Sequence, residues 1–288
     1  TITKAALEEI EADTTDAVMR NINTSKFKRS FHDNPYFKKM CENIGAFIDN
    51  LLNQEVLSGL YSIKSFDNYL FEHSIDSAIL ALLMGKRLNL SAEKLKQIAI
   101  GQFLHDIGYI FIDENLTRKS DKLTQEEHEQ IKLHTTYGYE LLKDIETIGA
   151  ASAHIAYQHH ERQDGNGYPR GLKGTNKIEK GDIVYADEQK MILIAEITAI
   201  ADFYDACTSD RPHRASLPPD LVHELVRVGA TSQFNKELVD CFLWIMPKYP
   251  IGCEVKIKNG RYRDFTGIVA SLNKHEISKP KVRLLYDN

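Results

Sequence analysis

From about residue 69 to residue 246, apolar side chains recur every three or four positions along the chain. Ile75, Ile79 and Leu82 form one such stripe. This spacing matches the 3.6-residue period of the α-helix and makes one face of each helix apolar. Helices of this kind bury their apolar faces against one another, so the pattern predicts a mainly α-helical bundle.

Local signals mark where several of these helices begin and end. Ser91 is a good N-cap for one helix, and Thr124 with Glu127 forms a capping-box pattern before another. Gly108 is a stop signal after the helix that closes near His105. We therefore expect the helix to end near His105 and Asp106.

The pattern changes after Pro250. Residues 253–258 alternate apolar and polar side chains, and the Asn259-Gly260 dipeptide that follows is typical of hairpin turns. Such a pattern predicts a small C-terminal antiparallel β module. The chain thus divides into an N-terminal helical region or linker at 1–64, a helical domain at 65–249, and the β module at 250–288.

The composition is that of an ordinary soluble globular protein, with 288 residues of which 42% are hydrophobic and 27% are charged. The net charge is −5, from 36 Lys and Arg against 41 Asp and Glu. This balance argues against a DNA- or RNA-binding protein, which needs a basic field to neutralise phosphates. Basic side chains do gather in the β module, where we expect a solvated face: Lys256, Lys258, Arg261, Arg263, Lys279, Lys281 and Arg283.

The four cysteines are scattered and form no CxxC pair, so we expect a reducing, cytoplasmic setting without a disulfide framework. No apolar run approaches the roughly 18 residues of a membrane span. The first residues are too polar for a signal peptide. Because the chain begins with Thr1 and not with Met, we expect a fragment whose residues 1–64 are a helical subdomain or a linker to an upstream sensor domain.

Histidine and aspartate side chains fall at the ends and on the inner faces of the predicted helices. His134 lies at helical spacing from Ile131, Gly138 and Leu141, so it faces the interior. Taken singly, an inward histidine is more often a hydrogen-bonded core residue than a ligand. Taken together, so many polar groups directed at one interior would be costly without partners. The set comprises His73, His105, Asp106, His134, His159, His160 and at least one of Asp202 and Asp205.

Bound metal ions would remove that cost. Neutral imidazole and carboxylate suit first-row divalent ions such as Fe, Mn, Ni or Zn. The adjacent pairs His105-Asp106 and His159-His160 can serve two ions, because neighbouring helical side chains point about 100° apart. Two ions held together can activate a water and clamp both oxygens of an in-line phosphoryl displacement.

The string His-His-Glu-Arg-Gln-Asp-Gly-Asn-Gly-Tyr-Pro at 159–169, with His105-Asp106 before it, resembles the HD-GYP subfamily of HD phosphohydrolases. The resemblance covers residues 65–249, which would be the catalytic domain. It implies an HD-type helical bundle and hydrolysis of the bacterial messenger cyclic di-GMP, to pGpG or on to GMP.

The same resemblance implies a ligand set for two transition-metal ions, Fe or Mn before Ni or Zn. Asp106 would bridge the two ions and, with His105, form the catalytic pair. Some relatives hold a third ion with a Glu at the position of Tyr69, which is a poor ligand, so we expect two ions. The implied metal ligands are His73, His105, Asp106, His134, His159, His160 and Asp202.

Substrate contacts are also implied by the resemblance. Tyr109 stands where the family usually has a Lys that helps hold the substrate phosphate, which predicts a slow enzyme that Tyr109→Lys would accelerate. The alternative is that the pocket has repacked around the Tyr109 ring. The glycine loop would shape one wall of the site or offer a surface to partner proteins. The implied contacts are Tyr109, Gly167, Tyr168, Pro169, Asp205, Arg211 and Arg214.

Two other functions stay open from the sequence. One is a phosphodiesterase for another cyclic dinucleotide or phosphoester. The other is a weakly active module that binds cyclic di-GMP and signals through protein partners. A homodimer stays open as well. The segment 179–193 is longer than is usual in the family and would form a lid, with Asp187 and Glu188 exposed. Trp244, Phe234 and Phe242 are interpreted as core residues.

Overall fold

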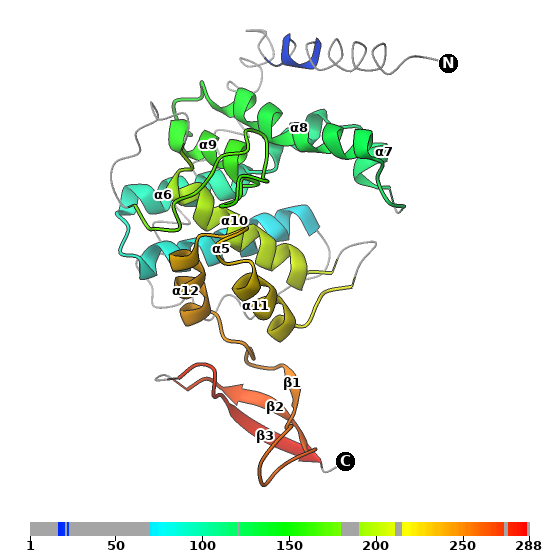
Figure 1. Ribbon diagram of the computed structural model, residues 1–288, viewed down its shortest axis with the longest axis vertical. Coiled ribbons are helices and arrows are strands. Elements are labelled where there is room, and N and C mark those ends of the chain that lie inside the picture. The colour runs from blue at the N-terminus through cyan, green and yellow to red at the C-terminus, as the bar shows by residue number, and fades with distance from the viewer. Residues whose placement is uncertain are drawn as a thin grey trace.

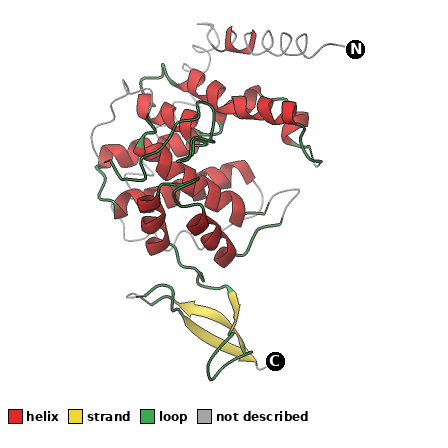
Figure 2. Cartoon of the chain, viewed as in Figure 1, coloured by secondary structure: helices red, strands yellow, loops and turns green. Residues whose placement is uncertain are grey.

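The computed structural model describes residues 17–20, 22, 69–119, 121–179, 190–210, 215–273 and 276–286. Within these ranges the chain is a helical bundle followed by a small sheet (Figures 1 and 2). This confirms the predicted fold class. The elements are α5 (Tyr69–Arg87), α6 (Ala92–Leu104), the 3-10 helix η1 (Ile107–Phe111), α7 (Glu114–Thr117), α8 (Gln125–Leu142), α9 (Ala150–Gln158), α10 (Leu193–Thr208), α11 (Pro219–Val228), α12 (Lys236–Ile245), β1 (Glu254–Lys256), β2 (Thr266–Ser271) and β3 (Lys281–Tyr286).

Helix α10 is the central helix of the bundle. Most of its residues are buried, and it contacts α5, α6, α9, α11 and α12. A helix that is apolar on nearly every side is stable only inside other structure. Any ionisable side chain on α10, such as Asp202 or Asp205, is therefore placed within the bundle and must find partners there.

The predicted helix caps are confirmed where the structure describes them. The Ser91 hydroxyl accepts a hydrogen bond from the Lys94 amide at the start of α6. Thr124 and Glu127 form a complete capping box at the start of α8. Helix α6 ends at Leu104, so the following His105 and Asp106 lie where the chain turns into η1.

The C-terminal sheet is antiparallel, with strand order β1-β2-β3, as the alternating pattern predicts. Gly260 has a φ of +88°, a left-handed conformation that glycine adopts without strain, in the loop between β1 and β2. The sheet follows α12 and lies beyond the end of the bundle in Figure 1. The strands therefore take no part in the interior where the histidines gather.

One core prediction is wrong. Phe234 and Phe242 are buried as expected, but Trp244 is 62% exposed. Helix α12 turns Phe242 toward the core, and the Trp244 ring lies outside with the Arg87 guanidinium 4.0 Å from its centroid. An amphipathic Trp that packs under an arginine is stable at a surface. The prediction from apolar character alone therefore placed Trp244 in the core incorrectly.

Several sequence predictions fall outside the described residues. These include nearly all of the 1–64 region and most of the 179–193 segment, where Asp187 and Glu188 lie. Among the helices that the structure describes, none combines the length and hydropathy that a membrane span requires.

Candidate metal centre

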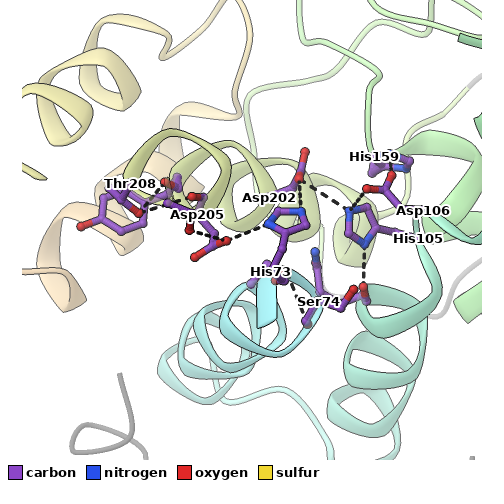
Figure 3. A network of polar contacts seen from close by, with 12 residues as sticks. His73, Ser74, His105, Asp106, His159, Asp202, Asp205 and Thr208 are labelled. Atoms are coloured by element: carbon purple, nitrogen blue, oxygen red, sulfur yellow. Dashed lines mark hydrogen bonds and ion pairs between the residues drawn. The ribbon is translucent and has the colours of Figure 1, made fainter. Parts of the chain in front are cut away.

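Seven side chains from six segments of the bundle meet at one place, and Figure 3 shows His73, Asp106 and Asp202 among them. They come from α5, the end of α6, α8, the end of α9 and α10, and from the turn that opens η1. Helix ends contribute more of them than helix middles, because a chain that turns can direct adjacent residues to different sides. The seven are His73, His105, Asp106, His134, His159, His160 and Asp202.

The first part of this cluster, here called the carboxylate half, contains His73, His105 and Asp202 together with Oδ2 of Asp106. Asp202 Oδ1 lies 3.1 Å from His73 Nε2 and 3.5 Å from His105 Nε2. Asp106 Oδ2 lies 3.4 Å from His105 Nε2. Two imidazole nitrogens and two carboxylate oxygens thus surround one position, a donor set that suits a divalent first-row ion.

The second part, here called the histidine half, contains His134, His159 and His160 together with Oδ1 of Asp106. The Nε2 atoms of His134 and His159 are 3.3 Å apart. One ring nitrogen from each of the three histidines lies within 4.8 Å of the others. Three neutral imidazoles and a carboxylate oxygen form a second donor set for a divalent ion.

Asp106 belongs to both halves. Its Oδ1 lies 3.6 Å from Nε2 of His134 and 3.6 Å from Nε2 of His159, while its Oδ2 faces His105. A carboxylate whose oxygens face two separate donor sets can bridge two ions. Asp106 is also 24% exposed, whereas His105 is fully buried, so the centre is open to solvent on the Asp106 side.

Backbone carbonyls orient three of the histidines. Because a carbonyl oxygen only accepts hydrogen bonds, each Nδ1 that meets one must carry the proton, and each Nε2 keeps its lone pair for an ion. The acceptors lie three residues earlier in the chain, so the helices themselves supply them. The pairs are His105 with Gln102 (2.6 Å), His134 with Ile131 (2.7 Å) and His159 with Ala156 (3.0 Å).

Asp205 faces inward from α10 together with Asp202, and it contacts a histidine of the carboxylate half. Its side chain is fully buried, and its Oδ2 accepts a hydrogen bond from His73 Nδ1 at 2.7 Å. One turn earlier on α10, Asp202 faces the other nitrogen of the same ring. Asp205 therefore orients His73 from behind, and this burial contradicts the expectation of a substrate contact.

Charges in the carboxylate half favour protonated histidine. Burial by itself lowers the pKa of His73, but Asp202 and Asp205 outweigh it and raise the pKa to about 10. Burial also opposes ionisation of Asp202, yet hydrogen bonds to His105 and His73 hold its pKa well below the ordinary value. Without an ion, this half is an ion-pair network that holds protons.

In the histidine half, the pKa values of His134 and His160 are lowered instead of raised. Burial lowers the pKa of His134 to about 4, although Asp106 partly opposes that shift. Burial and the neighbouring His159 lower the pKa of His160 well below its usual value. These imidazoles are neutral near pH 7, the protonation state in which histidine binds metal.

The glycine loop folds back against the histidine half. A Cβ at Gly167 would lie 2.5 Å from the His160 carbonyl oxygen, so only glycine allows this approach. The Tyr168 amide donates to the same carbonyl, and its ring centroid lies 4.7 Å from that of His160. Tyr168 thus packs against the histidine half, and its contact with substrate stays a prediction.

Buried Glu161 holds the far end of this loop. Its two carboxylate oxygens accept hydrogen bonds from the backbone amides of Arg170 and Leu172, each at 2.8 Å. The residues between, Pro169 included, are therefore held as a closed loop beside the centre. Sequence reasoning treated the loop as turn chemistry plus a site wall and did not find this carboxylate anchor.

Tyr109 is half-buried, and its ring stacks on the imidazole of His134, with centroids 4.3 Å apart and planes 9° apart. The substrate contact expected of Tyr109 and the repacking alternative both stay predictions. Arg211 and Arg214 lie outside the described residues, as does the side chain of Tyr69.

A sequence model of the HD domain family matches residues 58–178. That match includes six of the seven converging side chains and the glycine loop, while Asp202 lies beyond it.

Several curated proteins are similar to this chain in sequence. A cyclic di-GMP phosphodiesterase of Pseudomonas aeruginosa is 26% identical over 256 residues, which is 88% of this chain and 56% of that protein. A cyclic di-GMP phosphodiesterase response regulator of Xanthomonas campestris is 34% identical, over 56% of this chain and 39% of its own length. A 3'3'-cGAMP-specific phosphodiesterase of Vibrio cholerae is 32% identical, over 57% of this chain and 35% of that protein. The chain thus spans about half or less of the length of these relatives.

Among solved structures, a HDGYP protein of Bdellovibrio bacteriovorus superposes with a TM-score of 0.56 at 17% identity. The superposition covers 83% of this chain and 70% of that chain. This likeness supports the helical fold.

Proposed function

We propose that this chain is a metal-dependent phosphodiesterase that hydrolyses cyclic di-GMP. The observation that carries the proposal is the placement of Asp106, whose two oxygens face two separate sets of ring nitrogens. Relatives named cyclic di-GMP phosphodiesterases support the choice of substrate.

The residues fit two divalent ions, which we propose to be Fe or Mn, with Ni or Zn as further candidates. The seven converging residues would be the ligands, and Asp106 would bridge. The preset Nε2 lone pairs support this assignment, because the histidines need no reorientation on binding. When bound, the ions would lower the pKa of a bound water and offset charge on the phosphoryl oxygens.

The chain's own groups would prepare the site for in-line attack. Asp106 and His105 would form the catalytic pair, with Asp106 holding the two ion positions at a fixed separation. Asp205 keeps His73 oriented through the 2.7 Å hydrogen bond. Tyr168 and its loop would exclude bulk water from the histidine half, and the partly exposed Asp106 marks the side from which the messenger would enter.

Arg211 and Arg214 remain proposed contacts for phosphate and guanine, because a guanidinium fork matches both partners. Losing one charge-assisted contact would weaken substrate binding roughly ten- to a hundredfold. Gly167, Tyr168 and Pro169 would line the wall, and the outer side of their loop is a candidate surface for signalling partners.

A second substrate is favoured by one observation, the 32% identity to a phosphodiesterase named specific for 3'3'-cGAMP. The test incubates the purified, Mn- or Fe(II)-loaded chain with cyclic di-GMP, 3'3'-cGAMP and cyclic di-AMP separately. Chromatography then resolves linear and mononucleotide products. We expect cyclic di-GMP to be cleaved fastest. Cleavage of 3'3'-cGAMP alone would change the substrate, and tight binding of all three without product would indicate a binding module.

We further propose that residues 65–249 are the catalytic unit, that 1–64 are an N-terminal helical region or linker, and that 250–288 are a separate β module. The family match at 58–178 supports the first of these assignments. We place the activity in the cytoplasm, where the scattered cysteines would stay reduced.

A further inference from the structure

Helix α10 carries a buried carboxyl group that the proposed mechanism does not use. Glu196 lies in the first turn of the helix, six residues before Asp202, and is 8% exposed. Its Oε1 accepts hydrogen bonds from Gln163 Nε2 at 2.5 Å and from Asn235 Nδ2 at 3.2 Å. Gln163 belongs to the glycine loop, and Asn235 is the N-cap of α12. One carboxyl group therefore joins three segments of the chain.

Backbone amides fix which atom of each carboxamide faces Glu196. The Asn176 amide donates to Gln163 Oε1 at 3.0 Å, so Gln163 presents Nε2 to the carboxyl group. The Glu237 amide donates to Asn235 Oδ1 at 3.0 Å, as the N-cap position requires, so Asn235 presents Nδ2. Both carboxamides are buried, and the side chain at position 196 must accept hydrogen bonds from both.

The backbone that Glu196 holds is the backbone that leaves the histidine half. Gln163 follows His160 by three residues. The Gly174 amide donates to the Gln163 carbonyl at 3.2 Å, which closes the loop on itself. Gly174 also passes close to the Gln163 carboxamide, since a Cβ there would lie 2.0 Å from Oε1. The Gln163 side chain is thus enclosed between its own loop and α10.

We propose that Glu196 is a positioning residue that holds the glycine loop closed against the histidine half and so fixes that wall of the substrate site. The inference rests on the proposed function only in taking this loop as a wall of the site. Without an acceptor at position 196, two buried amide donors would each lose a partner, and opening of the loop to water would relieve that loss.

Hydrogen–deuterium exchange of the full chain measures how firmly the loop is held. The amides of Tyr168, Arg170 and Leu172 are hydrogen-bonded in the closed loop, so their exchange reports its opening. Glu196→Leu removes the acceptor, and Glu196→Gln keeps one. Burial raises the pKa of Glu196 to about 7, so a neutral side chain of the same shape suits this position.

Thr198→Val is the matched control. Thr198 is fully buried two positions along α10, and its Oγ1 donates to the Ile194 carbonyl within the same helix. The substitution therefore removes a buried hydrogen bond from α10 without touching the contact to the loop. Thermal melting checks that each variant folds. If Glu196→Leu does not fold, Gln163→Leu removes the same hydrogen bond from the loop side and is measured in its place.

We expect the loop amides to exchange at least about tenfold faster in folded Glu196→Leu, because buried donors without an acceptor favour opening. Glu196→Gln and Thr198→Val should exchange within about twofold of the wild-type rate. With cyclic di-GMP as substrate, Glu196→Leu should raise the KM about tenfold, and Glu196→Gln should restore it.

Unchanged loop exchange in folded Glu196→Leu would overturn the proposal. Failure of Glu196→Gln to restore slow exchange would also overturn it, as would equal loosening of the loop in Thr198→Val. Faster exchange with an unchanged KM would overturn the role of the loop as a wall that Glu196 fixes. Failure of the proposed function is a separate result: the expected exchange rates combined with no hydrolysis of any cyclic dinucleotide by the wild-type chain.

Discussion

The two halves of the centre hold their histidines by different means. In the carboxylate half, His73 lies between two acidic groups, with Asp202 at 3.1 Å and Asp205 at 2.7 Å. The two carboxylates therefore make this half strongly negative, which favours a bound cation. Its histidines are held by charge, and a proton competes with an ion for the same nitrogen.

The histidine half relies on packing and on backbone carbonyls. His134 is stacked on Tyr109, His160 lies against Tyr168, and Asp106 presents a carboxylate oxygen to His134. The imidazoles of His134 and His160 are neutral near pH 7, because burial lowers the pKa of each. The same bundle thus holds the histidines of one ion position by nearby charges and those of the neighbouring position by burial and packing. Asp106 belongs to both positions.

The largest expected effect comes from removing that shared side chain. Asp106→Ala should abolish binding of both ions and lower hydrolysis by at least about a thousandfold, because each half loses an oxygen ligand. Elemental analysis of the purified protein measures the ions. The exposed Asp121 offers a control, since Asp121→Ala should keep both. Retention of one tightly bound ion in Asp106→Ala would show that the halves are independent.

Removing a ligand from one half should affect only that half. His105→Ala and His159→Ala are each expected to lower the ion content from about two to about one per chain, because each deletes one nitrogen of one donor set. Titration with Mn(II) followed by electron paramagnetic resonance distinguishes a coupled pair from a single ion. Loss of both ions in either variant would contradict the division into halves.

A smaller effect is expected from the group behind His73. Asp205→Asn keeps the size of the side chain but removes its charge, so it should weaken the ion of the carboxylate half roughly ten- to a hundredfold. The ion of the histidine half is the internal reference. The matched control is Asp240→Asn, at a site that is 63% exposed on α12. Equal weakening of both ions would indicate a general loss of structure.

The smallest effects concern the stability of the metal-free protein, where the halves should respond to pH in opposite directions. The pKa of His73 is raised to about 10 in the folded protein. Its contribution to the free energy of unfolding is therefore complete below about pH 6.5 and is lost as the pH rises through 10. The pKa of His134 is lowered to about 4 in the folded protein. Its contribution to the free energy of unfolding is therefore complete above about pH 6.5 and is lost as the pH falls toward 4.

Urea unfolding between pH 4 and pH 10 measures both effects. His73→Ala should flatten the alkaline side of the profile, and His134→Ala the acidic side. If both substitutions flatten the same side, the assignment of opposite protonation states is incorrect.

The parts of the fold that local chemistry controls were predictable. The N-cap at Ser91 and the capping box at Thr124 depend on neighbouring residues, and the structure has both. The exposed position of Trp244 was not predictable in this way, because an apolar side chain on a helix does not reveal whether a neighbouring helix will cover it. Arg87, which covers the ring in its place, is distant in the chain.

The sequence by itself determined that the chain forms a helical bundle with a β module, and it named the seven side chains that meet in the bundle. Helix period, caps and residue chemistry are properties of short segments and directed these polar groups inward, while the choice of Asp202 over Asp205 came from the resemblance to the HD-GYP subfamily. Only the tertiary structure decided how those side chains are divided, since the two oxygens of Asp106 face partners from three different segments. It also decided that Asp205 lies behind His73 and that Tyr109 covers His134, because long-range packing selects which side chains touch.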